Sequence, residues 1–492
     1  MTALTYKDII VMPYNIRVDQ IEMTQQMNAH TTLHLTGVIP DTFEDTYVYM
    51  TDAETMIEVL QIGHDGQTTA IFNGLALDVQ VKAVLGIYYL EIQAVSHTYT
   101  LDVKKVNQTY QDAHMPYSAL IASCIADQAG ADFIDHATNG AKLGSFTMQY
   151  LETDWEFLKR MASRFHTGLV PDAIHAGAKF YFGVPFQVGR IEKIEAINYR
   201  VKKAIGDFLV SSKNHLDGLT DSDYMYYEVE STQVLKIGNE VTFQSQQLYV
   251  YKIFSTIKDG LLKHIYTLTP QNGFSVHTTY NQAIIGASIQ GKVIDVAGDK
   301  IRLHVDFDEG QEKDKAYWFP YSTIYASEDN TGWYFMPELS DNVRIYFPSN
   351  RENEGIAISS VSKAPPQSGS MLAATNPSAQ EGAALPEDSR QDPGRMADPD
   401  VKTLRTKHGK QILLAPDRIV ISGGGLMISL MDDNGISIIS DKNITLQATD
   451  KVVINAKQIM VNANEKIEMT CQDSSIKMED KMEIKGTEVR AN

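Results

Sequence analysis

Cysteine is almost missing from this chain of 492 residues, which contains only Cys124 and Cys471. Two cysteines so far apart cannot supply a disulfide framework or a cysteine-based zinc site. Cys124 lies among apolar residues of a predicted helix, and we interpret it as a small buried core residue. The net charge of −19 argues against nucleic acid as a partner, because phosphate binding needs clustered Lys and Arg.

Two kinds of targeting segment are missing as well. The stretch Met1–Asp8 lacks the charged and apolar regions of a secretory signal peptide. No run in the sequence approaches the roughly 18 apolar residues of a membrane span. We therefore expect synthesis in the cytoplasm, and export by something other than the general secretory route if the protein acts outside the cell.

The composition is that of a folded protein, with 43% hydrophobic and 21% charged residues. A chain of this length is too long for one core, so three or more domains are expected. Alternating apolar patterns predict strands through most of the chain, and a segment rich in Pro, Ala, Ser and Gly predicts a linker. The predicted parts are a first β-barrel (1–105), a helical insert (106–168), a second β-barrel (169–282), an OB-like barrel (283–361), a linker (362–400) and a β-helical rod (401–492).

Helical periodicity is confined to the insert. Tyr117–Ala129 and Gln149–Phe165 carry apolar residues at intervals of three and four. In the second segment Thr153 or Asp154 can cap the helix, and Glu156 lies in the first turn, where the helix dipole favours a negative charge.

The last part of the chain repeats a short unit about every eight residues. Each unit has two apolar residues two positions apart, which places both on one face of a strand, and turn-forming or charged residues follow. Such a repeat is typical of a stacked β-helix. The predicted core residues of this rod are Ile428, Leu430, Ile436, Ile438, Ile444, Leu446, Val452, Ile454, Ile459, Val461, Ile467, Met469, Ile476, Met478, Met482 and Ile484.

This rod predicts an oligomer. Strands of three or four residues with one apolar face and two unpaired edges would invite aggregation in a single chain. Three copies wound around one axis would pair every strand with a neighbouring chain and bury the apolar faces. The alternative is a single-chain β-helix, whose coils are usually longer than eight residues.

Several motifs resemble those of VgrG proteins and related hubs of contractile tails. Gln149–Phe165 resembles the QY.E.D..FL.R stretch of that family. Gly332–Leu339 with Asp341 and Val343 resembles the signature of its OB domain, and Gly355–Val361 resembles the strand that closes that domain. Ser340 stands where the family usually has Gly. The resemblance covers nearly the whole chain in the family's domain order.

The resemblance implies a mainly β fold with two hub β-barrels and a helical insert, an OB-fold neck and a C-terminal intertwined triple-stranded β-helix. It also implies a homotrimeric hub that mimics a hexameric ring under the tail tube, and a spike that pierces membranes. Implied partners are the tail tube or tube-initiator protein, baseplate wedge proteins and the target cell envelope on firing. The particle would be a phage tail, a tail-like bacteriocin or a type VI-like system.

No residues for catalysis, cofactor binding or metal binding are predicted. His30 and His34 have metal-ligand spacing for a helix, but their surroundings are strand-like and we place them on a strand surface. Glu152, Asp154 and Glu156 could be imagined as paired carboxylates of a glycoside hydrolase, but they lie in a helix-capping region. Gly423–Gly425 lacks the Lys of a phosphate loop and predicts a tight bend at the entry to the rod.

We therefore predict a structural protein and no enzyme. The linker is too short for an inserted enzyme domain, and the last histidine is His408, so no His-x-His site stands at the apex. A separate PAAR-like tip protein is expected to cap the spike. The alternatives are a peptidoglycan hydrolase within the hub and a trimeric receptor-binding fibre.

Overall fold

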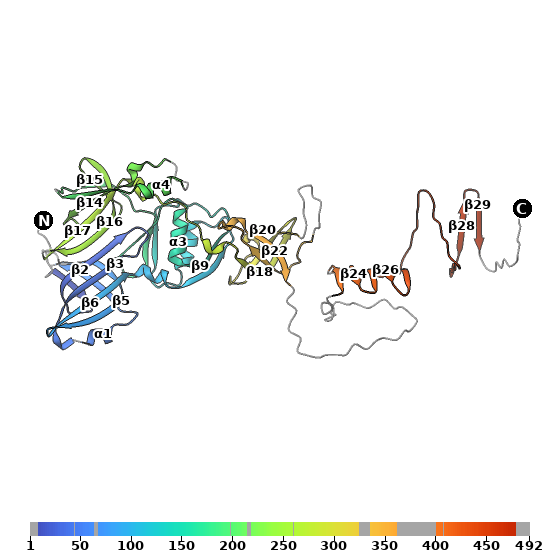
Figure 1. Ribbon diagram of the computed structural model, residues 1–492, viewed down its shortest axis with the longest axis horizontal. Helices are drawn as coiled ribbons and strands as arrows, with labels where there is room; N and C mark the ends of the chain where they lie inside the picture. Colours follow the sequence, from blue (N-terminus) through green and yellow to red (C-terminus); the bar gives the residue numbers. More distant parts are fainter. Residues whose placement is uncertain are drawn as a thin grey trace. The chain divides into compact units, whose positions relative to one another are not determined.

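The computed structural model describes residues 8–43, 45–62, 67–196, 198–213, 218–258, 260–323, 335–361, 400–406 and 408–478. The chain divides into two compact units, Met1–Gln367 and Ser368–Asn492, and each is described by itself. Figure 1 shows that strands dominate both units, which confirms the mainly β class. None of the helices in the described ranges combines the length and apolar character needed to cross a bilayer.

The first unit is built around a twelve-stranded sheet (Figure 1). Its path runs β1-β4-β5-β6-β3-β2-β16-β17-β14-β13, and β15 joins β12 to β16. The strands are β1 (Ile9–Met12), β2 (Arg17–Gln26), β3 (Thr32–Ile39), β4 (Met56–Ile62), β5 (Thr68–Val84), β6 (Ile87–Ser96), β12 (Gln187–Lys193), β13 (Tyr199–Lys203), β14 (Met225–Ser231), β15 (Asn239–Phe243), β16 (Gln246–Lys258) and β17 (Leu261–Thr269).

The two predicted hub barrels share this one sheet. β2 and β16 pair antiparallel, from Gln26 opposite Lys252 to Glu22 opposite Thr256. Within the described residues neither half closes on itself, so the prediction of two separate barrels is corrected to one open sheet with two halves. Alternation along a strand shows which face is buried but not which strand lies alongside, and this is why the sequence pattern missed the junction.

Short helices flank the two halves of the sheet. α1 (Thr46–Met50) lies between β3 and β4, and α4 (Ile205–Lys213) follows β13. Each half buries its own apolar core, one around Leu35, Phe72 and Ile92 and the other around Val241, Val250 and Tyr266. β4 and β5 pair antiparallel, and residues 63–66 between them lie outside the described ranges.

The insert forms a third core. α2 (Tyr117–Ile125) ends earlier than the predicted Ala129, and α3 (Asp154–Ser163) begins where the capping signal placed it. Thr153 caps α3: its side chain accepts from the N–H of Glu156, and the Glu156 carboxylate accepts from the N–H of Thr153. The strands here are β7 (Lys105–Tyr110), β8 (Asp132–Asp135), β9 (Thr147–Thr153), β10 (Leu169–Pro171) and β11 (Lys179–Phe182).

The predicted OB-like segment is a five-stranded antiparallel sheet in the order β20-β19-β18-β21-β22. Its inward residues, among them Leu303, Phe319 and Ile345, are fully buried. Ser340 has a φ of 75°, a left-handed conformation that favours glycine. The strands are β18 (Ser288–Ala297), β19 (Lys300–Val305), β20 (Trp318–Pro320), β21 (Asn342–Tyr346) and β22 (Ile356–Val361).

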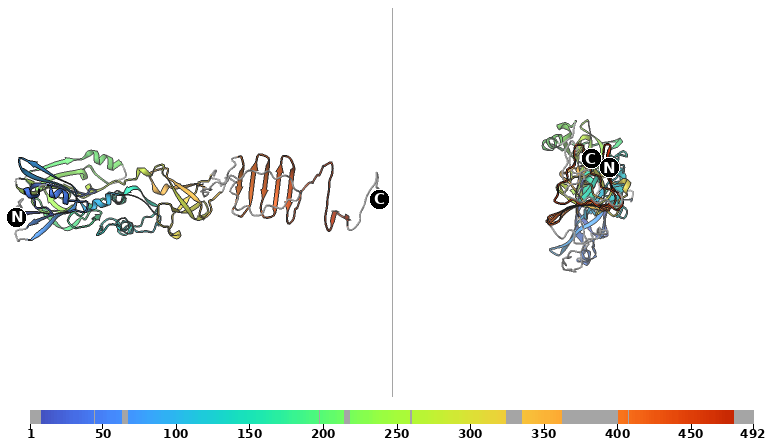
Figure 2. Two further views of the ribbon diagram at one scale, coloured as in Figure 1. Left: turned by 90° about the horizontal axis from the view of Figure 1, so that it is seen from below. Right: turned by 90° about the vertical axis from the view of Figure 1, so that its right-hand side faces the viewer.

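The second unit begins with a five-stranded antiparallel meander, visible as successive rungs in Figure 2. Its strands are β23 (Lys402–Arg405), β24 (Gln411–Ala415), β25 (Arg418–Ser422), β26 (Leu426–Met431) and β27 (Gly435–Ser440). A second hairpin pairs β28 (Ile467–Cys471) with β29 (Ser474–Met478). The predicted linker lies almost wholly outside the described residues, as does the chain after Met478.

Candidate functional site: the hub–OB junction and the apolar face of the C-terminal sheet

A buried ion-pair network ties the insert to the OB domain. Arg160, on the buried side of α3, is only 5% exposed. Its Nε and Nη2 each lie 2.7 Å from an oxygen of Glu152, and its Nη1 lies 2.6 Å from Oε1 of Glu352. Arg164, one turn further along the helix, contacts the other oxygen of Glu352 at 2.5 Å. Two arginines and two carboxylates thus neutralise one another, with Arg160 and Glu352 buried and Arg164 partly exposed.

The two carboxylates around Arg160 favour its charged form. Burial alone would lower the pKa of Arg160, but the nearby Glu352 and Glu152 carboxylates outweigh it and raise the pKa. Nη2 of the guanidinium, which donates to Glu152, also donates to the carbonyl of Met148 at 2.7 Å. The network therefore fixes the direction of α3 relative to the OB domain through geometry as well as charge.

A second set of contacts joins β7 and its extension to the OB domain. Asp308 accepts hydrogen bonds from the backbone N–H of Thr109, at 2.8 Å, and from its hydroxyl. Gln111 donates to the carbonyl of Leu303 at 3.1 Å and accepts from the N–H of Tyr317 at 3.2 Å. Burial raises the pKa of Asp308, against the hydrogen bonds from Thr109 that favour its charged form.

The apolar core of the OB domain includes two residues of the insert. Phe146 and Met148 are fully buried together with Phe319 and Phe347. The ring centroids of Phe146 and Phe319 lie 5.0 Å apart in an edge-to-face arrangement. The OB domain is thus attached to the insert by a shared core, a buried ion network and further hydrogen bonds.

The carboxylates considered for hydrolysis all have local structural partners. Both oxygens of Glu152 contact Arg160, and Glu156 completes the capping box with Thr153. Asp154 accepts from the side-chain amide of Gln149 at 2.9 Å, and burial raises its pKa. The interpretation of this region as a helix start is confirmed.

The placement of His30 on a strand surface is wrong. His30 lies in the turn before β3, largely buried, while His34 is exposed within the strand. The His30 ring contacts the hydroxyl of Thr98 at 2.8 Å and the carboxylate of Asp102 at 3.2 Å, and burial lowers its pKa. The alternation of apolar residues along a strand gives no information about a side chain such as His30, which lies before the strand and packs against Trp155 of the insert.

Other candidate groups are also structural. Cys124 is buried, and burial raises the pKa of its thiol to about 12, which confirms it as a core residue. In the described part of the chain no group of three or more His, Cys, Asp or Glu side chains converges as metal ligands would. Gly423–Gly425, with Gly424 at a φ of 62° and Gly425 at 80°, forms a tight bend, but it joins β25 to β26 inside the sheet, three strands after the sheet begins.

One face of the C-terminal sheet carries nine large aliphatic side chains that no other described part of the chain covers. Its side chains stand in two ladders across the strands, where each residue lies opposite the next. All nine are exposed by 38 to 73% in the single chain. The ladders are Leu404, Ile412, Ile421, Ile428 and Ile438, and Leu414, Ile419, Leu430 and Ile436.

This sheet corrects the pairing that we expected for the first of the eight-residue units, which we call octads. Ile428 and Leu430 lie opposite Ile438 and Ile436 of the same chain, so these strands pair within the chain and not with a neighbour. The apolar character of the face was predicted, and it extends back to Leu404, before the first octad. The spacing of the strands before the first octad departs from eight residues, so the repeat did not identify them.

The middle octads form no strand pairs in the described structure. Ile444, Leu446, Val452, Ile454, Ile459 and Val461 are all more than half exposed, in a stretch without assigned strands. Ile467 and Met469 lie in β28, opposite Met478 and Ile476 of β29. Met482 and Ile484 lie outside the described residues.

Comparisons with known proteins point to one class of assembly. Residues 289–361 match the family of the type VI secretion system and phage-baseplate injector OB domain. No curated protein matches the chain. The E. coli c3393 protein, described as a type VI secretion component with structural similarity to the T4 tail proteins gp27 and gp5, superposes with a TM-score of 0.50 at 12% identity, over 72% of this chain and 99% of that one.

Two structures of the Francisella PdpA–VgrG complex are similar as well. In the lidded form the TM-score is 0.52 at 9% identity, over 86% of this chain and 76% of the matched chain. In the half-lidded form it is 0.50 at 10% identity, over 86% and 83%. The chain therefore carries an injector-type OB domain and has the fold of a VgrG-like baseplate hub, which confirms the resemblance found in its motifs.

Proposed function

We propose that this protein is the homotrimeric baseplate hub and membrane-puncturing spike of a contractile injection system. The observation that carries the proposal is the apolar face of the β23–β27 sheet, which follows an injector-type OB domain in the same chain. Nine large aliphatic side chains left in water would cost on the order of 1 kcal/mol each relative to burial. A face of this kind marks an interface.

The occupant of this face is the same face of two further copies. The nine residues of the two ladders are all Leu or Ile, so the face matches its own copies in chemistry, and three such sheets would form a closed prism with a dry interior. The exposed middle octads are consistent with a continuation of the same three-chain prism. Because residues 441–466 contain no strand pair within the chain, we infer that they pair with neighbouring chains and form the intertwined part of the spike.

The mechanism is mechanical. Sheath contraction would drive the tube and hub forward, and the spike would concentrate that force on a narrow point of the target cell envelope. The buried Arg160–Glu352 network and the shared Phe146 core supply a stiff joint between hub and neck. We propose synthesis in the cytoplasm and assembly into a tail particle, with tube or tube-initiator, wedge and PAAR-like tip proteins as partners.

No observation favours the two alternatives. A hydrolase needs a carboxylate free to act, and Glu152 and Glu156 are bound in local structure. A receptor-binding fibre would not need the injector-type OB domain or the hub fold. We therefore propose a structural role without enzymatic activity.

Molar mass in solution tests the proposal. Light scattering coupled to size exclusion should give about three times the chain mass of 54.9 kDa for the purified full-length protein. A monomer at micromolar concentration would refute the spike. Zones of clearing by the purified protein on a peptidoglycan gel would refute the absence of enzymatic activity.

A further inference from the structure

A hollow of about 540 Å³ lies along α3 in the first unit. Its lining comes from α3, from the β7–β9 pair and from residues 276–282, which lead from the twelve-stranded sheet toward the OB domain. Because every lining residue belongs to the first unit of one chain, the hollow is complete without the trimer of the proposed function. The residues that give it its character are Lys105, Leu151, Lys159, Arg160, Tyr280 and Asn281.

The buried part of this lining is polar and held in place. Arg160, Ser163 and Asn281 are each exposed by 8% or less. The Ser163 hydroxyl lies 3.0 Å from that of Thr279 and accepts from the Thr279 N–H at 2.9 Å. The side-chain amide of Asn281 donates to the carbonyl of Tyr150 at 2.7 Å, and Arg160 is held by its carboxylates. These groups are satisfied, so the capacity for a ligand must come from the rest of the lining.

Two lysines of the lining have no ion-pair partner in the described part of the chain. They are Lys105, at the start of β7, and Lys159, on α3. Burial lowers the pKa of His30, and the charge of Lys159 lowers it further, so this ammonium lies near the interior of the unit. The lining also holds one arginine and two glutamates, so three cations stand against two carboxylates. The hollow therefore has one positive charge in excess.

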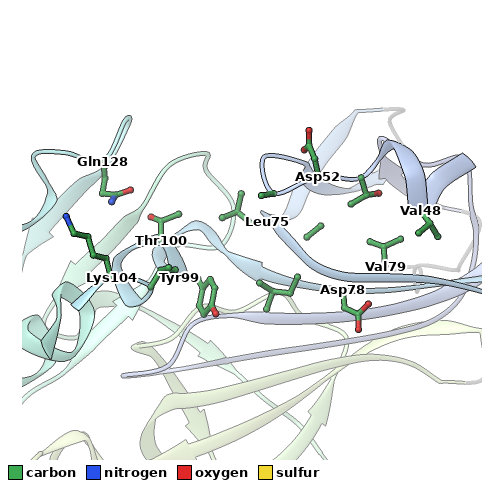
Figure 3. Close-up of a pocket in the computed structure, with 14 residues that line it drawn as sticks. Val48, Asp52, Leu75, Asp78, Val79, Tyr99, Thr100, Lys104 and Gln128 are labelled. Carbon is green, nitrogen blue, oxygen red and sulfur yellow. The ribbon is translucent and has the colours of Figure 1, made fainter. Parts of the chain in front are cut away.

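A second hollow in the same unit has the opposite charge balance. It has a volume of about 810 Å³ and lies beside β5 in the first half of the sheet (Figure 3). Lys104 stands at one end, and Asp52 and Asp78 lie toward the other, so carboxylates outnumber ammonium groups there. Electrostatics alone would therefore direct an anion to the hollow along α3 and not to this one.

Two large side chains of the α3 hollow remain in water. Leu151 is 47% exposed and Tyr280 is 42% exposed. Leu151 lies at a bulge, where the register of β7 and β9 shifts between Val106 and Asn107, and its φ is 53°. Its N–H donates to Oδ1 of Asn107 at 2.8 Å, which fixes this left-handed conformation. The conformation is strained for leucine and keeps an aliphatic side chain in water, and contact with a bound partner would offset that cost.

We propose that the α3 hollow binds an acidic, apolar segment of a partner protein. A carboxylate of that segment pairs with Lys105 and Lys159, and a neighbouring aliphatic side chain covers Leu151 and Tyr280. The volume is within the roughly 300–1,000 Å³ of ordinary ligand sites. A free inorganic anion would leave the two apolar side chains wet, and a neutral apolar peptide would leave the lysines unpaired. The lining therefore favours one segment that carries both kinds of group.

The position of the hollow gives such a segment a structural consequence. Residues 276–282 form one wall and α3 forms another, and the contact of Ser163 with Thr279 joins these walls. A bound segment would touch both walls. It would therefore attach its protein beside the joint between the insert and the OB domain, where Arg160 of the same helix reaches Glu352.

Fluorescence anisotropy of the purified full-length protein tests the proposal. The probe is a fluorescein-labelled hexapeptide of alternating glutamate and leucine, and we expect saturable binding below about 1 mM that weakens as salt rises. Lys105→Met combined with Lys159→Met keeps the aliphatic stems, removes both charges and should weaken binding at least tenfold. Lys300→Met, at an exposed position of β19 outside the hollow, is the matched control and should bind as the unchanged protein does.

Reversed charges separate this site from unspecific attraction. Lys105→Glu combined with Lys159→Glu should bind an alternating lysine–leucine hexapeptide in place of the glutamate–leucine probe, with at least a tenfold change in preference. A glutamate–serine hexapeptide should bind the unchanged protein at least fivefold more weakly than the probe, because it has no apolar side chain to cover Leu151 and Tyr280. Equal binding of these two acidic peptides would overturn the proposal.

Leu151→Asn tests whether the strained leucine serves binding. Asparagine adopts a positive φ readily, so the thermal unfolding midpoint should hold or rise while the affinity for the probe falls at least threefold. A leucine with a merely structural role would lower the midpoint and leave the affinity unchanged, which would contradict its place in the site. The proposal is overturned if the unchanged protein shows no saturable binding, or if binding survives the loss of both lysine charges, whatever light scattering shows of the trimer.

Discussion

Arg160 and Glu352 lie 192 residues apart in the sequence, yet Nη1 of the arginine contacts Oε1 of the glutamate at 2.6 Å in a site closed to water. This pair is one of the contacts through which the helical insert holds the OB domain, beside the hydrogen bonds of Thr109 and Gln111. A single buried charge without its partner would be costly, so the four groups of the network depend on one another. The joint is therefore cooperative, and the loss of one group weakens all its contacts.

Replacement of Arg160 by methionine should destabilise the first unit by about 3–5 kcal/mol, because Glu152 and Glu352 would remain buried without their main counter-charge. We expect a clear fall in the thermal unfolding midpoint of the full-length protein. Lys315→Met, which removes an exposed ion pair with Glu312, is the control and should leave the midpoint unchanged. Equal shifts in both variants would contradict the role assigned to the network.

Ile428→Asp should prevent assembly of the spike, since it places a charge at the centre of the nine-residue apolar face. We expect light scattering to show loss of the trimer. Ser437→Asp, on the opposite face of the adjacent strand, is the matched control and should remain trimeric. A trimer of normal stability in Ile428→Asp would mean that the face has another occupant.

Local signals predicted the parts of this protein well. The capping box at Thr153 and Glu156 and the apolar face of the octads both follow from patterns within a few residues. The relations between parts did not follow. The β2–β16 junction and the Arg160–Glu352 pair join distant segments, and alternation or charge in one segment carries no information about its partner.

In the middle octads, too, the sequence pattern predicted strands but not their partners. Alternation predicted strands at Ile444–Leu446, Val452–Ile454 and Ile459–Val461, and these residues have the right composition. In the single chain they form no ladder, because a strand needs a neighbour and the chain itself does not supply one. Sequence therefore identified the apolar face, while the pairing of strands within the chain had to come from the structure.

Ser340→Gly should stabilise the first unit by about 0.5–1 kcal/mol. Ser340 adopts a φ of 75° between β20 and β21, where a side chain is strained, and its N–H donates to the carbonyl of Val293 at 2.8 Å. Glycine would keep this hydrogen bond and relieve the strain. The measurement is the denaturant midpoint, with Ser349→Gly, in a nearby loop without a positive φ, as the control that should not gain stability.

Acidification should weaken the hub through His264. This residue is buried in β17, where its Nδ1 lies 2.7 Å from the hydroxyl of Ser255, and burial lowers its pKa from 6.5 to about 4. The unfolded chain then binds a proton below about pH 6.5 that the folded chain accepts only near pH 4, so stability is full above pH 6.5 and falls as the pH drops toward 4. The loss from this group is roughly 3 kcal/mol at most. His264→Asn should flatten the dependence of the unfolding midpoint between pH 7 and 4.5, whereas His34→Asn, at an exposed position of β3, should leave it intact; an unchanged slope in His264→Asn would assign the acid sensitivity to other groups.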